Sequence, residues 1–276
     1  MTNEVLSFPR FGKYFKYDLT QMWRNNGKAV VMLGGISLIV YLIWVIFSLV
    51  FTGTWNGPDM AVRAAVMMLG WFILVLYQTR TYGYLTEKRA GSSWLMVPAS
   101  SLEKCLSMLL ITVVLQPLAY FIAYLLVDGF LALVDPTVGT ALIASVGTAT
   151  TELREALAEG VAQGFDVHVW MFFIPVILQA MYNLMYFLLC GLCFKKWKLV
   201  GAFAVLVGFS IVMTLLFSLF AWGDWVDKLQ MIKDMDDPET VIGFVNGLLS
   251  AVTVANFLTF LLMGCGIYYR IKTLKH

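Results

Sequence analysis

Charged residues are scarce in this chain. Of its 276 residues, only 13% are Asp, Glu, Lys or Arg, whereas 60% are hydrophobic and 15% are aromatic. A soluble domain carries about 25% charged residues, because it must cover its surface with groups that water solvates. The composition therefore excludes a soluble enzyme and a disordered protein, argues against a nucleic-acid-binding protein, and points to a polytopic membrane protein.

Residues that bind metals or form disulfides are also few, since the chain has two His and four Cys. Cys190 and Cys193 form a C-x-x-C pair, but His168 lies at the opposite end of the same apolar run. A zinc site needs four ligands, so we expect these cysteines to pack between helices and to bind no metal. The sequence has neither a P-loop nor an H-E-x-x-H motif. We therefore expect no enzymatic activity and no cofactor bound by this chain itself.

Apolar runs of about 20 residues, the length that a helix needs to cross a bilayer, occur six times. Five of them have no formal charge, and the second contains Arg63 near its start. We expect Arg63, and Asp128 after the third run, to reach the headgroup region. Period-2 alternation is absent, so we predict an all-α membrane protein of six transmembrane helices in one domain, residues 1–276. The predicted spans are residues 29–51, 60–79, 105–127, 167–194, 199–223 and 240–269.

Basic residues are distributed unevenly among the segments that join the apolar runs. If the N-terminal segment is cytoplasmic, that side holds 15 basic and 4 acidic residues, and the other side holds 4 basic and 13 acidic residues. The corresponding net charges are +11 and −9. Lys and Arg are retained on the cytoplasmic side of membranes. The sequence therefore predicts that both termini are cytoplasmic.

The segment before the first run has the periodicity of an amphipathic helix. Phe11, Phe15 and Leu19 recur at a spacing of four residues, and basic residues fall between them. This pattern predicts a helix over residues 8–24 that lies on the membrane surface. The Asn-Asn-Gly sequence at residues 25–27 is expected to end that helix before the first span.

Two segments on the acidic side show similar spacing of apolar residues. They are residues 151–162 and 222–235, and we expect short helices at the outer membrane surface. Acidic residues gather over 234–239, but they lack the spacing of a calcium-binding loop, and we expect a solvated loop there.

The segment of residues 84–104 mixes charged residues with an apolar group that begins at Trp94. Pro98 follows this group, and Ser100 and Glu103 have the spacing of a capping box, which predicts the start of the third helix. An apolar group on a loop in water is unfavourable unless another surface covers it. The cover is either a partner protein or the membrane interface, where Trp is common, and both interpretations stay open.

A few uncharged polar residues lie inside the predicted spans. They are Gln116 in the third span and, in the fourth, Gln179, Asn183 and Tyr186, which recur at spacings of four and three. Such residues either hydrogen-bond between helices or line a substrate path. We favour contacts between helices, which polar side chains commonly make in membrane bundles.

The order of these parts resembles that of the permease subunits of ABC-2 type transporters. An amphipathic helix precedes six spans, and a long cytoplasmic loop joins the second span to the third. In that family this loop carries an L-x-x-P-x-S element followed by E-K at the start of the third span. The matching residues here are Leu95, Pro98, Ser100, Glu103 and Lys104. The external loop after the third span is longer than in many members of the family.

The resemblance implies an exporter subunit in a bacterial inner membrane. It further implies a separate ATPase subunit that binds ATP, and two permease units, identical or similar, around one pathway. Residues 8–24 would be the connecting helix, and residues 222–235 would be a gate helix. The residues implied in docking the ATPase are Glu87, Lys88, Arg89, Trp94, Leu95, Met96, Pro98 and Glu103.

A second class of function fits the same pattern. A non-transporting sensor or assembly protein would use the same loop to bind a cytoplasmic partner that hydrolyses nothing. A lipid-modifying enzyme is disfavoured, because the spans lack a cluster of Asp, His or Arg. The substrate is left open, since uncharged spans suit lipids, drugs and peptides alike.

Overall fold

A computed structural model describes residues 6–86, 91, 94, 96–162, 170–233 and 238–273. Within these residues every regular element is helical, and six helices are long and apolar enough to cross a membrane. The predicted all-α fold with six spans is therefore confirmed in its helix content. Helices dominate because each one pairs its own backbone N–H and C=O groups, which hydrocarbon cannot do.

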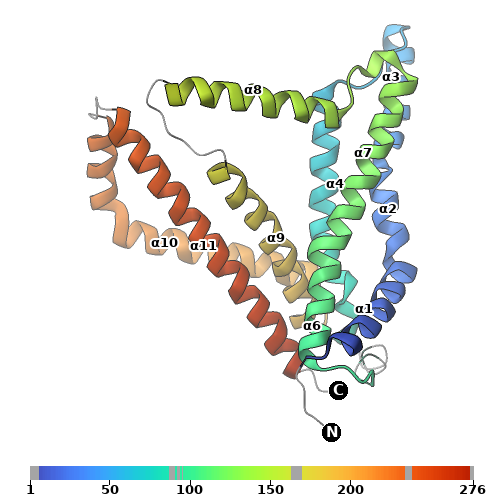
Figure 1. Ribbon diagram of the computed structural model, residues 1–276, viewed down its shortest axis with the longest axis vertical. Helices are drawn as coiled ribbons and strands as arrows, with labels where there is room; N and C mark the ends of the chain where they lie inside the picture. Colours follow the sequence, from blue (N-terminus) through green and yellow to red (C-terminus); the bar gives the residue numbers. More distant parts are fainter. Residues whose placement is uncertain are drawn as a thin grey trace.

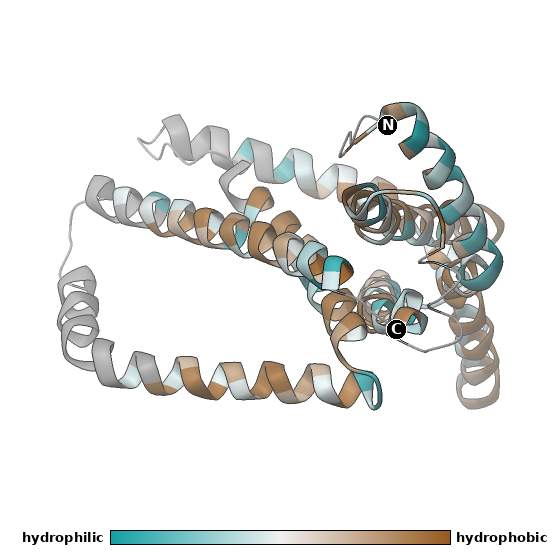
Figure 2. Cartoon of the chain, turned by 90° about the horizontal axis from the view of Figure 1, so that it is seen from below, coloured by the Kyte–Doolittle hydropathy of each residue, from teal (hydrophilic) through white to brown (hydrophobic). Residues whose placement is uncertain are grey.

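The first span continues directly from the amphipathic segment. Helix α1 (Phe8–Met22) leads through one π-helical turn, η1 (Trp23–Gly27), into α2 (Lys28–Gly34) and α3 (Ile36–Thr52). The predicted break at Asn-Asn-Gly is wrong, because the chain stays helical there. A π turn keeps the backbone hydrogen-bonded while it accommodates the extra residue. The outer side of α1 is largely hydrophilic, as the view in Figure 2 shows.

The second and third spans are also followed or interrupted by helical segments that are not α-helical. Helix α4 ends in a 3₁₀ turn, and the third span begins at a capping box, contains a second π-helical segment and then runs on as α7. Pro117 explains the irregularity, since it lacks the N–H that would bond four residues back, and its ring crowds that carbonyl group. The elements are α4 (Met60–Thr81), η2 (Gly83–Thr86), α6 (Ser101–Leu109), η3 (Leu110–Leu115), α7 (Gln116–Val134) and η4 (Pro136–Val138).

Four helices complete the chain: α8 (Leu142–Ala162), α9 (Trp170–Cys193), α10 (Lys198–Lys233) and α11 (Pro238–Thr273). The helix predicted over 151–162 is present and begins nine residues earlier, as the start of α8 shows. The separate helix predicted over 222–235 is not present, because residues 222–233 continue α10. A glycine such as Gly223 costs a helix only about 1 kcal/mol and does not end it.

The helices form two groups that diverge from one end of the molecule (Figure 1). One group contains α2, α3, α4 and α7, and the other contains α9, α10 and α11. Helix α8 extends across the top of the view, at a large angle to α4 and α7. Helix α1 begins and α11 ends at the bottom of the view, which we call the terminal end, and we call the opposite end the α8 end.

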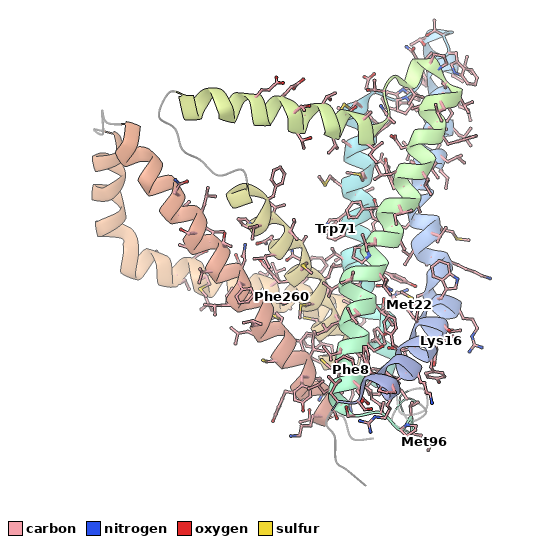
Figure 3. The ribbon with its side chains drawn as sticks, viewed as in Figure 1. Phe8, Lys16, Met22, Trp71, Met96 and Phe260 are labelled. Atoms are coloured by element: carbon pink, nitrogen blue, oxygen red, sulfur yellow. The ribbon has the colours of Figure 1, made fainter. Side chains whose placement is uncertain are left out.

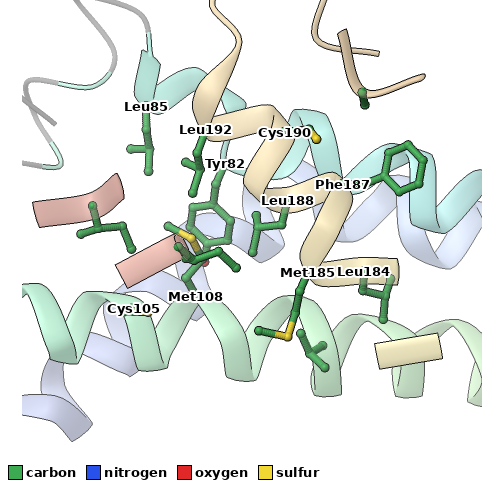
Figure 4. Packing of buried hydrophobic residues seen from close by; sticks show 14 of the residues in the cluster. Tyr82, Leu85, Cys105, Met108, Leu184, Met185, Phe187, Leu188, Cys190 and Leu192 are labelled. Carbon is green, nitrogen blue, oxygen red and sulfur yellow. The ribbon is translucent and has the colours of Figure 1, made fainter. Parts of the chain in front are cut away.

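The two groups are joined near the terminal end by a cluster of buried apolar side chains (Figure 4). Helix α9 packs against both α4 and α11 there. Gly191 allows this approach, because a Cβ atom at its position would lie 2.5 Å from the carbonyl oxygen of Thr79. The cluster includes Tyr82, Leu85, Cys105, Met108, Leu184, Met185, Phe187, Leu188, Cys190 and Leu192.

Candidate functional site

The loop between α4 and α6 has its exposed tip at the terminal end of the molecule. The Met96 side chain is 83% exposed and Pro98 is exposed, and Figure 3 shows Met96 at the lower edge of the structure. Four of the residues implied in docking, Glu87, Lys88, Arg89 and Leu95, lie outside the described residues.

Trp94 does not belong to this exposed tip. Its side chain is only 4% exposed and forms part of the buried cluster that joins the helix groups. The Lys104 ammonium lies 4.6 Å from the centre of the indole ring and donates a 3.0 Å hydrogen bond to the Trp94 carbonyl oxygen. The prediction that Trp94 belongs to an exposed apolar group is wrong, because the protein's own core covers this ring, whereas Met96 of that group is exposed. Loop composition does not reveal which of several apolar residues turns inward.

Glu103 fixes the base of the loop. Its backbone N–H and carboxylate form the predicted capping box with Ser100, which is confirmed. The same carboxylate accepts a hydrogen bond from the backbone N–H of Ser7 and two 2.9 Å bonds from Nε of Arg10, whose Nη2 lies 2.8 Å from Oε1. Both carboxylate oxygens of Glu103 therefore accept hydrogen bonds from within the chain, and these bonds hold α1 against α6.

A second carboxylate, Asp18, was not predicted as a functional residue. It lies on α1 and is buried, and its Oδ2 accepts hydrogen bonds from Tyr82 (3.0 Å) and Ser107 (2.6 Å). The signal in the sequence is a single acidic residue in a helix whose other charges are basic. Asp18 thus links α1 to both α4 and α6 beneath the loop.

The α8 end contains a buried ion pair. Nη1 of Arg63 lies 2.8 Å from Oδ1 of Asp128, and Nη2 donates to the carbonyl oxygens of Val138 and Thr140. The other carboxylate oxygen of Asp128 accepts a 2.8 Å bond from the backbone N–H of Leu142, at the start of α8. Arg63 does not extend outward as expected, because both side chains are buried and pair with each other, although Nε of Arg63 has no hydrogen-bond partner.

Asp135 organises the loop beside this ion pair. It accepts hydrogen bonds from the Tyr41 hydroxyl (2.6 Å), the Trp55 indole N–H (2.8 Å) and the Thr137 hydroxyl (2.7 Å). Burial alone would raise the pKa of Asp135, but these hydrogen bonds outweigh it and lower the pKa to about 2. The carboxylate is therefore charged at any physiological pH.

The polar residues predicted inside the spans are not gathered at one place. Tyr186 donates a 2.7 Å bond to the Ala202 carbonyl oxygen and so connects α9 to α10. Gln179 is exposed and bonds to Tyr182 on its own helix, and Asn183 is half-buried. Gln116 is buried, and neither of its amide atoms has a hydrogen-bond partner. Tyr186 thus contacts a neighbouring helix, as we favoured, whereas the Gln116 amide makes no hydrogen bond to these α9 residues.

Gln78 was missed by the sequence analysis. It is fully buried on α4, and neither its amide nitrogen nor its amide oxygen has a hydrogen-bond partner. It lies next to the end of the second apolar run, where a polar residue is expected as the chain leaves the membrane and does not indicate burial. Gln78 and Gln116 are thus two buried amides with unused hydrogen-bonding capacity.

Two of the hollows between the described helices are large and mainly apolar. One, of about 510 Å³, is an apolar cleft between α4, α7 and α9, where the rings of Trp71 and Phe121 stack 5.3 Å apart. The other, of about 450 Å³, lies where α1 bends into α2 beside α7, and we call it the elbow groove. The residues that line the elbow groove are Leu19, Thr20, Met22, Trp23, Gly27, Val30, Leu115, Gln116 and Ala119.

Within the described residues, no three His, Cys, Asp or Glu side chains lie close enough to hold a metal ion. Comparison of the chain with protein-family models, with curated proteins and with solved structures finds no match. The features that bear on function are therefore the exposed loop tip, the contacts that fix its base, and the two hollows.

Proposed function

We propose that this chain is the membrane-spanning subunit of an ATP-driven exporter of the ABC-2 type, located in a bacterial inner membrane with both termini in the cytoplasm. The net charges of +11 and −9 on the two sides support this orientation. The start of α1 and the end of α11 lie at the same end of the molecule, which is consistent with six crossings (Figure 1).

The observation that carries the proposal is a loop with an exposed apolar tip on a fixed base. Met96 projects from the terminal end, whereas Trp94 is buried and Glu103 is bonded to Arg10. A partner that binds the tip would pull on α6 and, through Glu103, on α1. This arrangement suits a loop that passes motion from a separate ATPase subunit to the spans.

The docking role is tested with Met96→Glu in the full chain, co-expressed with a candidate ABC-type ATPase from the same genome. A buried apolar anchor at an interface contributes at least about 2 kcal/mol, so we expect about thirtyfold weaker association and loss of the ATP hydrolysis that the membrane subunit stimulates. Trp197→Glu is the matched control, because Trp197 is 79% exposed in the connection between α9 and α10.

Two outcomes of this experiment would count against the proposal. If Met96→Glu and Trp197→Glu both retain the wild-type yield of complex, the loop tip does not dock the ATPase. If the wild-type chain co-purifies with no ATPase and stimulates no hydrolysis, the exporter assignment fails. A sensor or assembly protein would then be the better description.

Pairing with a second permease unit is supported by α10. Ala204 and Gly208 are exposed and four residues apart, the spacing of small residues at which two membrane helices approach closely. A cysteine introduced at Ala204, in a chain whose exposed Cys193 and Cys265 are replaced by Ser, is expected to form a cross-linked dimer in membranes. Gly208→Leu should prevent this cross-link, and a chain that stays monomeric without that substitution would contradict the pairing.

A further inference from the structure

The elbow groove is lined by residues from both of the described π-helical segments, η1 and η3. Trp23 and Gly27 belong to η1, and Leu115 ends η3 immediately before Gln116. Single π-helical turns in membrane and soluble proteins occur frequently at functional sites. At Gly27 the departure from α geometry is tied to the groove itself, because a Cβ atom there would lie 2.6 Å from the Trp23 indole ring, which forms one wall.

The groove is lined mainly by apolar side chains, with Thr20 and Gln116 as its uncharged polar residues, and the Thr20 hydroxyl already donates to the Lys16 carbonyl oxygen. Its volume of about 450 Å³ falls in the range of about 300–1,000 Å³ that is usual for small-molecule sites. Gln116 is 1% exposed, and neither its amide N–H₂ nor its amide oxygen has a partner. A buried amide without a partner is unfavourable, so a ligand that brings an acceptor to Gln116 while filling the apolar space gains on both counts.

The surface around the groove is positively charged. Lys16 lies one helical turn before Thr20, which lines the groove, and Arg24 lies one turn after it. Both basic side chains are exposed, and Figure 3 shows Lys16 projecting outward from α1. The nearest acidic residue in the sequence of α1, Asp18, is buried and bonded to Tyr82 and Ser107, so it does not neutralise this surface.

We propose that the elbow groove binds one anionic phospholipid. Its acyl chain lies against Val30 and Ala119, its glycerol ester oxygens accept from the Gln116 amide, and its phosphate lies near Lys16 and Arg24. A lipid suits this place because Trp side chains such as Trp23 favour the headgroup level, where ester groups and phosphates are found. Only the choice of leaflet, the cytoplasmic one, rests on the orientation proposed above.

The test is native mass spectrometry of the purified full-length chain, titrated with palmitoyl-oleoyl phosphatidylglycerol or with the matching phosphatidylcholine. We expect the wild-type chain to retain one phosphatidylglycerol at concentrations at which phosphatidylcholine dissociates. Ala119→Trp fills the groove and should abolish this retention. Leu118→Trp is the matched control, because Leu118 is the adjacent residue and lines the apolar cleft instead.

Two further variants separate the parts of the site. Gln116→Leu should weaken binding about three- to tenfold, the effect of losing one neutral hydrogen bond. The surface variant Lys16→Gln/Arg24→Gln should bind phosphatidylglycerol no better than phosphatidylcholine, and it keeps the test informative if Ala119→Trp fails to fold.

The proposal is overturned if Ala119→Trp retains phosphatidylglycerol as the wild type does, or if the wild type binds both lipids equally. It is also overturned if the wild type retains no lipid and Ala119→Trp instead breaks a dimer, because the groove would then be an interface between copies. None of these readouts involves an ATPase, so their failure is distinct from failure of the exporter assignment.

Discussion

Replacing Asp128 with Asn tests how the α8 end of the molecule is held together. The change keeps the size of the side chain and removes its charge, which leaves the Arg63 guanidinium buried without a counter-ion. Removing one partner of a buried ion pair typically costs about 3–5 kcal/mol. For a chain of this size we expect the midpoint of thermal unfolding to fall by about 6–20 °C.

The double variant Arg63→Met/Asp128→Leu measures how strongly the two charges stabilise each other. It removes both charges, but it leaves the Val138 and Thr140 carbonyl oxygens and the Leu142 N–H without their partners. Unmet buried hydrogen bonds cost about 1–3 kcal/mol each. The double variant should therefore remain less stable than the wild type, yet lose less stability than the single variants Arg63→Met and Asp128→Leu lose in sum.

The assay is thermal unfolding of the purified chain in one detergent, monitored by circular dichroism. It compares the wild type with Asp128→Asn, with the single variants Arg63→Met and Asp128→Leu, and with the double variant. Arg80→Met is the control, because Arg80 is exposed at the other end of α4. If Asp128→Asn behaves like Arg80→Met, or if the single effects add without coupling, the pair does not stabilise the α8 end as described.

Three further predictions concern single positions. The pKa of Asp135 is lowered from 3.8 to about 2, so the ionised carboxylate stabilises the fold fully above about pH 3.8 and progressively less as the pH falls towards 2. Thermal unfolding midpoints measured from pH 5 to pH 2 should show this loss in the wild type and lack it in Asp135→Asn. Gly191→Leu should force α9 away from Thr79 and cost about 1–3 kcal/mol, and an unchanged unfolding midpoint would contradict the close approach. Tyr186→Phe should cost about 0.5–1.5 kcal/mol if its bond to Ala202 stabilises α9 against α10, whereas the same change at exposed Tyr269 should have no effect.

The spans were predictable from the sequence because hydropathy is a local property. The described part of each apolar run that predicted a span is almost entirely helical, although the first run is divided between α2 and α3 and the third among α6, η3 and α7. The capping box at Ser100 and Glu103 was predicted from a spacing of three residues. The break at residues 25–27 was predicted wrongly for a related reason. Asn and Gly favour turns where water can hydrogen-bond to the backbone groups that a turn exposes. Near the membrane the chain is more stable when its backbone groups stay hydrogen-bonded to one another in a helix.

The pairs that hold the fold were not predictable. Arg63 and Asp128 are 65 residues apart, and Arg10 and Glu103 are 93 residues apart, so only packing brings them together. Trp94 was assigned to the surface on the composition of its loop, although its ring fills a space between helices that the sequence does not reveal. The exposed part of the candidate site, Met96 and Pro98, lies within the predicted segment, because an apolar group beside a proline is itself a local signal.

The bond between Arg10 and Glu103 has a consequence for biosynthesis. A ribosome that adds about 5–20 residues per second completes the 93 residues from Arg10 to Glu103 in about 5–20 s. During that interval α1 can bond to Tyr82 at the end of α4 but has no partner on the third span, so it depends more on the amphipathic face that we predict to contact the lipid surface. Substitutions on that face are therefore expected to act mainly on the nascent chain, by lowering the yield of inserted protein while leaving the stability of the finished molecule nearly unchanged.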